Sequence, residues 1–307
     1  MAARRRVRRG RVRPHGPPRQ RPPRPRLLPA GAGRRRHRRG SLPARRQRSA
    51  RRPHPQTDGI GWLLWALGET VDAAPAAARP AVLAQFQPLL DRGTTAAVRA
   101  LGATGLPAPS PDYWEKREDT VTLGTAAPLL AGLRAATHLY GLLGDADGVR
   151  SAGTAGQRLS AGIDAGFAPS YGRYPGSSAR DAAGAFLLPP FQPGTAPDDG
   201  DVRAALRSAV GQMQRPAGGL APGAHWAEDG VSWTPETALV ALGAASGTAT
   251  ADRTLATRLL DWLDAHRTPA GSFPEKVLAG GSPSGTAPLV WTSATVLLAL
   301  VTLGSAG

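Results

Sequence analysis

The amino-acid sequence predicts an all-α fold in which helical hairpins form an inner and an outer layer, an α/α toroid. From residue 58 onward the chain reads as successive helices with little alternating strand pattern. Two kinds of helix alternate along the chain: one kind is apolar on nearly all sides, and the other is apolar on one face only. Because an all-round apolar helix must be enclosed and a one-faced helix can cover it, the alternation indicates concentric rings.

The predicted inner helices are rich in apolar and small residues all round, and they lie near residues 59–68, 120–143, 182–188, 233–245 and 286–303. The predicted outer helices carry one apolar stripe and lie near residues 79–101, 148–163, 200–213 and 252–266. In the third of these, Val202, Leu206 and Val210 share the stripe. The last inner segment carries no charge, but its Thr, Ser and Pro content and its 18-residue length favour a buried core helix over a membrane span. We therefore expect no membrane partner.

The positive charge of the chain is confined to its start. Of the 38 basic residues, 21 are arginines within residues 1–57, a stretch that holds no Asp or Glu. The other 17 basic residues stand against all 22 acidic residues, so the rest of the chain is mildly acidic. We divide the chain into a leader, residues 1–55, and a helical domain, residues 56–307. The leader has too few aliphatic residues to bury a core and is predicted to be disordered.

The composition of the leader favours an out-of-frame or wrongly assigned start, since GC-rich DNA read in the wrong frame gives this mixture of Arg, Pro, Gly, Ala and His. A functional basic tail and a targeting segment are the alternatives. A tail that binds nucleic acid usually contains Lys and interleaved aromatic residues, which the leader lacks, so we expect no specific nucleic-acid partner. No apolar run reaches the ~7–15 residues of a signal peptide, and a cytoplasmic location is expected.

Metal and cofactor chemistry has little support in the sequence. The chain has no cysteine, and its six histidines are scattered rather than paired at ligand spacing. The sequence contains no phosphate-binding glycine loop, dinucleotide fingerprint or nucleophile elbow. We therefore expect neither a metal nor a cofactor.

Two glutamates share one local pattern. Glu115 lies in S-P-D-Y-W-E-K (110–116), and Glu275 lies in G-S-F-P-E-K-V (271–277). Each follows an aromatic residue closely, in a Gly/Pro-rich connection that leads into an inner helix. Such connections open on the same end of a toroid, so the two carboxylates can face each other across a pocket. A facing pair of carboxylates is the minimum apparatus for acid/base hydrolysis of a glycosidic bond.

Further polar and aromatic residues cluster on the same connections and predict one acidic, aromatic-lined pocket. The candidates for substrate binding are Asp58, Asp112, Trp114, Arg173, Asp181 and Trp291. A simpler role exists for some of them: Asp58 and Asp181 are also well placed as helix N-caps. Lys116 and Lys276 each follow one of the two glutamates, and we interpret this adjacency as coincidence rather than contact.

At these residues the helical domain resembles glycoside hydrolase family 15, the glucoamylase-like enzymes. The segment from Asp112 to Glu115 matches the family's D-x-W-E. The family's late glutamate segment is matched by Phe273-Pro274-Glu275 together with the later L-x-W-x-S at 289–293. Two further motifs of the family resemble residues 56–62 and 172–175. The resemblance implies an (α/α)6 barrel that hydrolyses α-glucosidic bonds with inversion. Glu115 would then be the general acid and Glu275 the general base, acting on an oligosaccharide or α-glucoside.

The chain departs from the family pattern at its start. The family's early Trp-x-Arg-Asp segment is absent, and the sequence predicts only five inner and four outer helices. We therefore expect a barrel that lacks its first hairpins and is a poor or inactive catalyst. The alternatives are a non-catalytic carbohydrate-binding remnant and an inverting α-glucoside phosphorylase on the same fold.

Overall fold

A computed structural model describes residues 56–193 and 199–305 of the chain. Helices dominate this part, so the predicted all-α class is confirmed. The predicted disorder of residues 1–55 lies outside the described residues. Within the described ranges, no helix is both long and apolar enough to cross a membrane.

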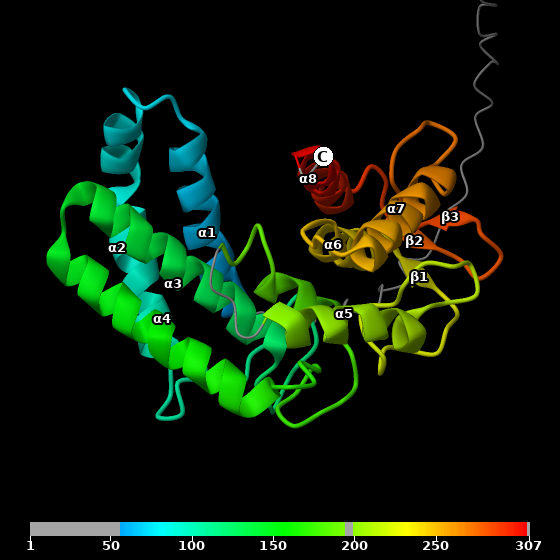
Figure 1. Ribbon diagram of the computed structural model, residues 1–307, viewed down its shortest axis with the longest axis horizontal. Coiled ribbons are helices and arrows are strands. Elements are labelled where there is room, and N and C mark those ends of the chain that lie inside the picture. Colours follow the sequence, from blue (N-terminus) through cyan, green and yellow to red (C-terminus); the bar gives the residue numbers. More distant parts are fainter. Residues whose placement is uncertain (1–55, 194–198, 306–307) are drawn as a thin grey trace, which may run out of the picture. The chain divides into compact units, whose positions relative to one another are not determined.

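Each predicted helical segment corresponds to one helix of the structure (Figure 1). The predicted inner helices are α1 (Asp58–Ala73), α3 (Leu123–Leu143), η1 (Ala182–Leu187), α6 (Thr234–Ala245) and α8 (Val290–Ser305). The predicted outer helices are α2 (Arg79–Ala100), α4 (Ala146–Phe167), α5 (Asp199–Met213) and α7 (Thr250–Ala265).

Packing follows the predicted alternation. The inner helices form a series in which α1 packs on α3, α3 on η1, η1 on α6, and α6 on α8. The outer helices α2 and α4 cover α1 and α3, while α5 and α7 pack on η1 and α6. Helix α3 is almost wholly buried over its first half. Thr122 caps its N-terminus by accepting a hydrogen bond from the Thr125 amide, and Gly144 ends it with a left-handed φ of 71°.

Two inner segments differ from the prediction. Of residues 182–188, only Ala182–Leu187 are helical. They form a six-residue 3-10 helix that ends before Pro189 and Pro190, which lack the amide hydrogens that would continue it. Helix α8 forms as expected but is not enclosed: Val290 is 76% exposed and Leu297 64% exposed. Its main neighbour is α6, and no other inner helix of the described residues packs extensively against it.

A small antiparallel sheet, which the helical pattern did not predict, joins two connections. It consists of β1 (Ser232–Trp233), β2 (Lys276–Val277) and β3 (Pro283–Ser284), in that order. Trp233 pairs with Lys276, so the sheet holds the residues before α6 against the segment that contains Glu275.

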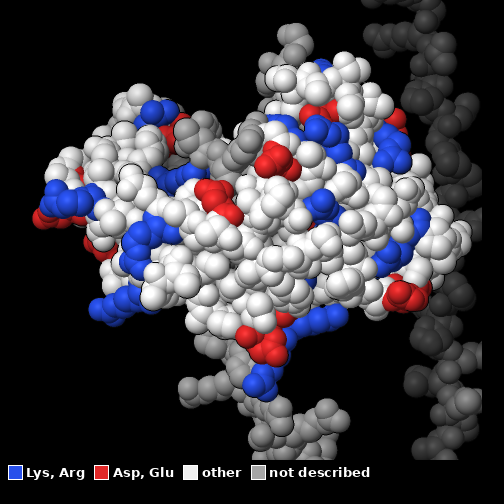
Figure 2. All heavy atoms as spheres, turned by 60° about the horizontal axis from the view of Figure 1, so that its bottom comes forward, with Lys and Arg blue, Asp and Glu red and all other residues white. Residues whose placement is uncertain are grey.

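Charged side chains on the face shown in Figure 2 are of both signs and are interspersed over a mainly uncharged surface. This distribution agrees with the small net charge of the helical domain.

Candidate active site

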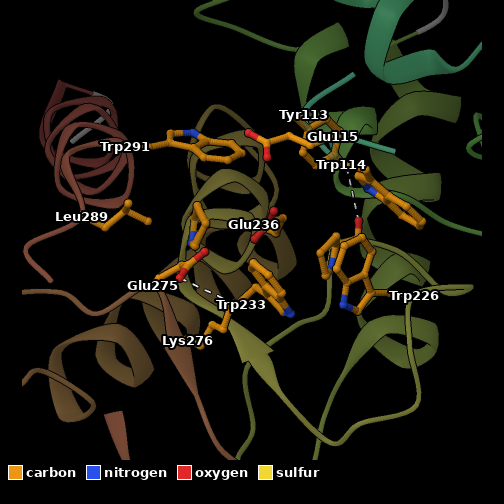
Figure 3. Close-up of a pocket in the computed structure, with 12 residues that line it drawn as sticks. Tyr113, Trp114, Glu115, Trp226, Trp233, Glu236, Glu275, Lys276, Leu289 and Trp291 are labelled. Atoms are coloured by element: carbon orange, nitrogen blue, oxygen red, sulfur yellow. Dashed lines mark hydrogen bonds and ion pairs between the residues drawn. The ribbon is translucent and has the colours of Figure 1, made fainter. Parts of the chain in front are cut away.

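A cavity of about 430 Å³ lies at the N-terminal ends of α6 and α8, beside the connection that precedes α3. This volume is typical of ligand sites, which span about 300–1,000 Å³. Tryptophans and carboxylates dominate its lining, which consists of Tyr113, Trp114, Glu115, Pro222, Trp226, Trp233, Pro235, Glu236, Glu275, Lys276, Leu289 and Trp291 (Figure 3). Both predicted catalytic glutamates therefore line one cavity, together with the predicted Trp114 and Trp291.

Glu115 is held by a tight turn. Its amide donates to the carbonyl of Asp112 at 2.7 Å, and the Trp114 amide donates to Asp112 Oδ1 at 2.9 Å. The turn leaves Glu115 with a φ of 55°, a left-handed conformation that is uncommon for a residue with a side chain. Such outliers cluster at functional sites, where the surrounding structure maintains them.

The anchor of this turn is a buried ion network centred on Arg173. Its guanidinium lies 3.0 Å from Asp112, 3.1 Å from Asp181 and 2.6 Å from Glu118. The same group stacks on the Trp114 ring, with Cζ 3.6 Å from the ring centre. Burial alone would lower the pKa of Arg173, but its acidic neighbours outweigh burial and the pKa lies above the ordinary value.

The other four predicted substrate-binding residues do not reach the cavity. Asp58, Asp112, Arg173 and Asp181 are all buried, and none of them lines the cavity. Asp181 caps η1 through the Ala183 amide and accepts a hydrogen bond from Tyr113, a residue that does line the cavity. Asp112 and Arg173 orient Trp114 and Glu115 from behind.

Asp58 is the first residue of α1, where its Oδ1 accepts a hydrogen bond from the Gly59 amide at 2.9 Å. Burial, and then the nearby charge of Asp112, raise the pKa of Asp58 to about 6. The start of α1 also contacts the Glu115 segment, because the Gln56 side chain donates to the Asp112 carbonyl at 3.2 Å.

Glu275 is positioned from the opposite side of the cavity by the small sheet and by α6. Its amide donates to the Thr286 carbonyl at 2.8 Å, and its carbonyl accepts from the Thr234 amide at 3.1 Å. Lys276 Nζ lies 3.7 Å from Glu275 Oε2. The interpretation that Lys276 does not contact Glu275 is therefore wrong: pairing with Trp233 across the sheet brings the lysine back over the cavity wall.

The tryptophans form a continuous wall. Trp226 meets Trp114 edge-on at 4.8 Å between ring centres and meets Trp233 at 5.2 Å. Lys116 Nζ lies 3.9 Å from the centre of the Trp226 ring, and Lys276 Nζ lies 4.2 Å from that of Trp233. Aromatic faces of this kind stack against the apolar face of a sugar ring, and nearby cations fix the rings in place.

Glu236 is a third carboxyl group at the cavity, and the sequence interpretation missed it. It is the third residue of α6 and only 3% exposed. Burial raises its pKa to about 8, with smaller contributions from Asp181 and Glu275. A signal was present in the sequence: Trp233-Thr-Pro-Glu236 resembles Phe273-Pro-Glu275, since in both an aromatic residue is followed closely by Pro-Glu.

The cavity can therefore hold a neutral polar ligand between carboxyl groups and indole rings. Among its lining residues, three carry a carboxyl group and one, Lys276, carries a positive charge. The described residues contain no group of three or more His, Asp or Glu side chains that could hold a metal ion.

Comparison with solved structures finds this arrangement of helices in carbohydrate-active proteins. A glycosidase variant in complex with glucose matches with a TM-score of 0.65 at 23% identity, over 82% of this chain and 68% of that one. A glucoamylase from Saccharomycopsis fibuligera matches with a TM-score of 0.62 at 13% identity, over 83% and 71%. A cellobiose 2-epimerase from Spirochaeta thermophila gives 0.55 at 15% identity, over 82% and 71%.

No family model matches this chain, and no curated protein matches it in sequence. At these identities the structural matches show the fold. The predicted glucoamylase-like toroid of helical hairpins is thus confirmed, and the chain has the fold of glycosidases. Because an epimerase shares that fold, the fold alone does not decide the reaction.

Proposed function

We propose that this chain is a glycoside hydrolase of the glucoamylase type that acts on α-glucosidic bonds with inversion. The observation that carries the proposal is the meeting of Glu115 and Glu275, far apart in sequence, in one cavity walled by tryptophans. The glucoamylase among the structural matches supports the same substrate class.

In this proposal Glu115 is the general acid. Its exposed side chain reaches the cavity from a strained turn, so it can approach the oxygen of the leaving sugar and protonate it as the bond breaks. Trp114 and the network beneath it maintain that turn while the proton is transferred.

Glu275 is the general base. The base of an inverting hydrolase takes a proton from a water molecule as that water attacks the opposite face of the sugar. Lys276 places a positive charge 3.7 Å from Glu275 Oε2 and pairs with it from the cavity wall.

The phosphorylase alternative has less support. A phosphate nucleophile needs positive charge around it, yet Lys276 is the single cation among the lining residues that the structure describes, and it already pairs with Glu275. The described lining therefore offers no unpaired positive charge to bind a phosphate nucleophile, and attack by water is favoured.

The decisive experiment measures glucose release from maltose and isomaltose by the purified chain, with NMR used to identify the first anomer formed. We expect β-glucose, and a loss of about 10²- to 10⁴-fold in kcat for Glu115→Gln and for Glu275→Gln. Glu228→Gln, an exposed position outside the cavity lining, is the matched control and should retain wild-type turnover.

Turnover that persists in both cavity variants would overturn the assigned roles. Sugar binding without turnover by the wild-type chain would favour the carbohydrate-binding remnant, in line with the weak catalysis expected from the sequence. Activity that requires added phosphate would favour the phosphorylase.

A further inference from the structure

Glu236 lines the cavity, yet the proposed hydrolysis gives its carboxyl group no task. Its Oε2 is buried and has no hydrogen-bond partner among the described residues. The nearby Lys276 is engaged elsewhere, 3.7 Å from Glu275 and over the Trp233 ring. Buried polar atoms in native proteins are almost always paired, because an unpaired one costs stability. An unpaired carboxyl oxygen on a residue that lines a cavity therefore points to a ligand that pairs with that carboxyl group.

A purely structural role for Glu236 is the first alternative. Acidic residues favour the first turn of a helix, where the backbone amides carry a partial positive charge, and Glu236 is the third residue of α6. An ionised carboxylate in that role gains most when water or a cap partner also reaches it. The backbone amide of Glu236 does form a hydrogen bond with its carboxyl group. The residue is only 3% exposed, however, and Oε2 stays unpaired, so the helix terminus does not account for that oxygen.

Two more residues of the described cavity lining also carry a buried polar atom without a hydrogen-bond partner. The indole Nε1 atoms of Trp114 and Trp233 are buried and lack hydrogen-bond partners within the described residues. Indole nitrogens only donate, so these positions call for acceptor oxygens. Three residues that line one cavity thus each carry an unpaired polar atom, a lining that suits a ligand with many oxygens and no net charge, such as a sugar.

We propose that Glu236 is a third ligand-binding carboxyl group of this cavity, and that its Oε2 forms a hydrogen bond with an oxygen atom of a bound neutral sugar. In the view of Figure 3, Glu236 lies between Glu115 and Glu275, where a sugar held by both catalytic groups would contact it. This role rests on the proposed carbohydrate ligand and is independent of hydrolysis.

The protonation state of Glu236 sets the direction of that hydrogen bond. Burial is the main cause that raises its pKa to about 8; the hydrogen bond from its own backbone amide and the charge of Lys276 oppose the rise, and Asp181 and Glu275 add to it. At neutral pH the group is therefore mainly a carboxylic acid, which donates its proton to an acceptor oxygen of the sugar. Above pH 8 it ionises and loses the donor, so sugar affinity should fall.

The test compares sugar affinity in the wild type, Glu236→Gln and Glu236→Ala. Maltose and glucose serve as probes, and binding is followed by the fluorescence of the cavity tryptophans between pH 6 and pH 9.5. We expect Glu236→Ala to weaken binding about 10- to 100-fold, the effect of leaving one buried hydrogen bond unmade. Glu236→Gln keeps a donor of the same shape and should bind at pH 7 within about threefold of the wild type.

The pH profile separates this role from a structural one. Wild-type affinity should fall by about tenfold from pH 7 to pH 9.5, while the affinity of Glu236→Gln should stay nearly constant over this range. Glu228→Gln, the exposed control, should follow the wild-type profile.

Each outcome decides a different point. Unchanged affinity in Glu236→Ala, in a wild type that binds maltose, overturns the role of Glu236 and leaves the proposed hydrolase intact. Binding without turnover overturns the proposed hydrolase activity, and the affinities of the Glu236 variants still test the role of Glu236 in binding. A wild type that binds neither probe contradicts the carbohydrate ligand and, with it, the role of Glu236.

Discussion

Arg173 decides whether three buried carboxylates can coexist beneath the cavity. It contacts Asp112, Asp181 and Glu118, and Asp112 in turn fixes the turn that carries Glu115. Buried carboxylates without a cation would repel one another and lose their hydration without compensation. Arg173, expected from the sequence to bind the substrate, is thus placed to hold the proposed general acid, Glu115, in position.

Replacement of Arg173 tests this placement. We expect Arg173→Ala to lower the free energy of unfolding by about 3–5 kcal/mol, since it leaves buried charges unpaired. Arg150→Ala removes an exposed ion pair with Asp147 and should change it by less than about 0.5 kcal/mol. Urea denaturation measures both. A loss in Arg173→Ala no larger than in the control would show that the network is not essential to the fold.

The site residues divide by what sequence can predict. Glu115 and Glu275 were predictable because a repeated local pattern marked both, and the fold brings them together. Asp112 and Asp181 were predicted at the correct end of the toroid, but they are buried and do not line the cavity. The sequence alone does not show whether a carboxylate is exposed to solvent or paired with a buried arginine. Glu236 was missed because a glutamate in the first turn of a helix is ordinary, and its burial becomes visible only in three dimensions.

At the scale of elements, the close contact of α1 with α3 places the start of α1 beside the site. A Cβ atom on Gly61 would lie 2.1 Å from the carbonyl oxygen of Pro128, and one on Gly132 would lie 2.7 Å from the Cα of Gly61. The two backbones therefore touch where these glycines face each other. The end of α1 at this contact leads to Gln56, which donates to the turn that holds Glu115.

Gly61→Ala should separate the two helices. We expect it to destabilise the fold by about 1–3 kcal/mol, because the added methyl group meets backbone that cannot rotate away. Gly59→Ala, two residues earlier in the same helix, has nothing within 4 Å of its new Cβ and should be neutral or stabilising by up to about 1 kcal/mol. Thermal unfolding of the pair measures the difference. Equal effects at the two positions would contradict close packing of α1 on α3.

Helical periodicity predicted the elements and their layers, because an enclosed helix has apolar residues on all sides and a covering helix has them on one face only. It failed at η1, where the apolar run was correct but two prolines limit the segment to a six-residue 3-10 helix. It also failed to predict the exposed side of α8, since an apolar helix carries the same pattern whether or not a neighbour covers it. The small sheet could not be predicted from the sequence, because strands of two residues are too short to show an alternating pattern of apolar and polar residues.

For the whole molecule, the buried carboxyl groups around the cavity link stability to pH. The pKa of Asp58 is raised to about 6 and that of Glu236 to about 8, both mainly by burial. Between the ordinary pKa values of these groups and the raised ones, the folded chain binds more protons than the unfolded chain. Their contribution to stability is therefore complete below the unfolded-state values, near pH 4, and is lost as pH rises through 6 and then 8.

We accordingly expect the free energy of unfolding to fall by several kcal/mol, on the order of 2–5, between pH 5 and pH 8.5. Glu236→Gln cannot ionise, so it should remove the larger part of this slope and should be more stable than the wild type at pH 8.5. Urea denaturation at pH 5, 7 and 8.5 measures the slope in both proteins. A Glu236→Gln variant less stable than the wild type at pH 8.5 would mean that the native carboxylate is charged and stabilising there. In that case the ionised Glu236 carboxylate stabilises the N-terminus of α6, and our expectation that burial keeps this group neutral would be wrong.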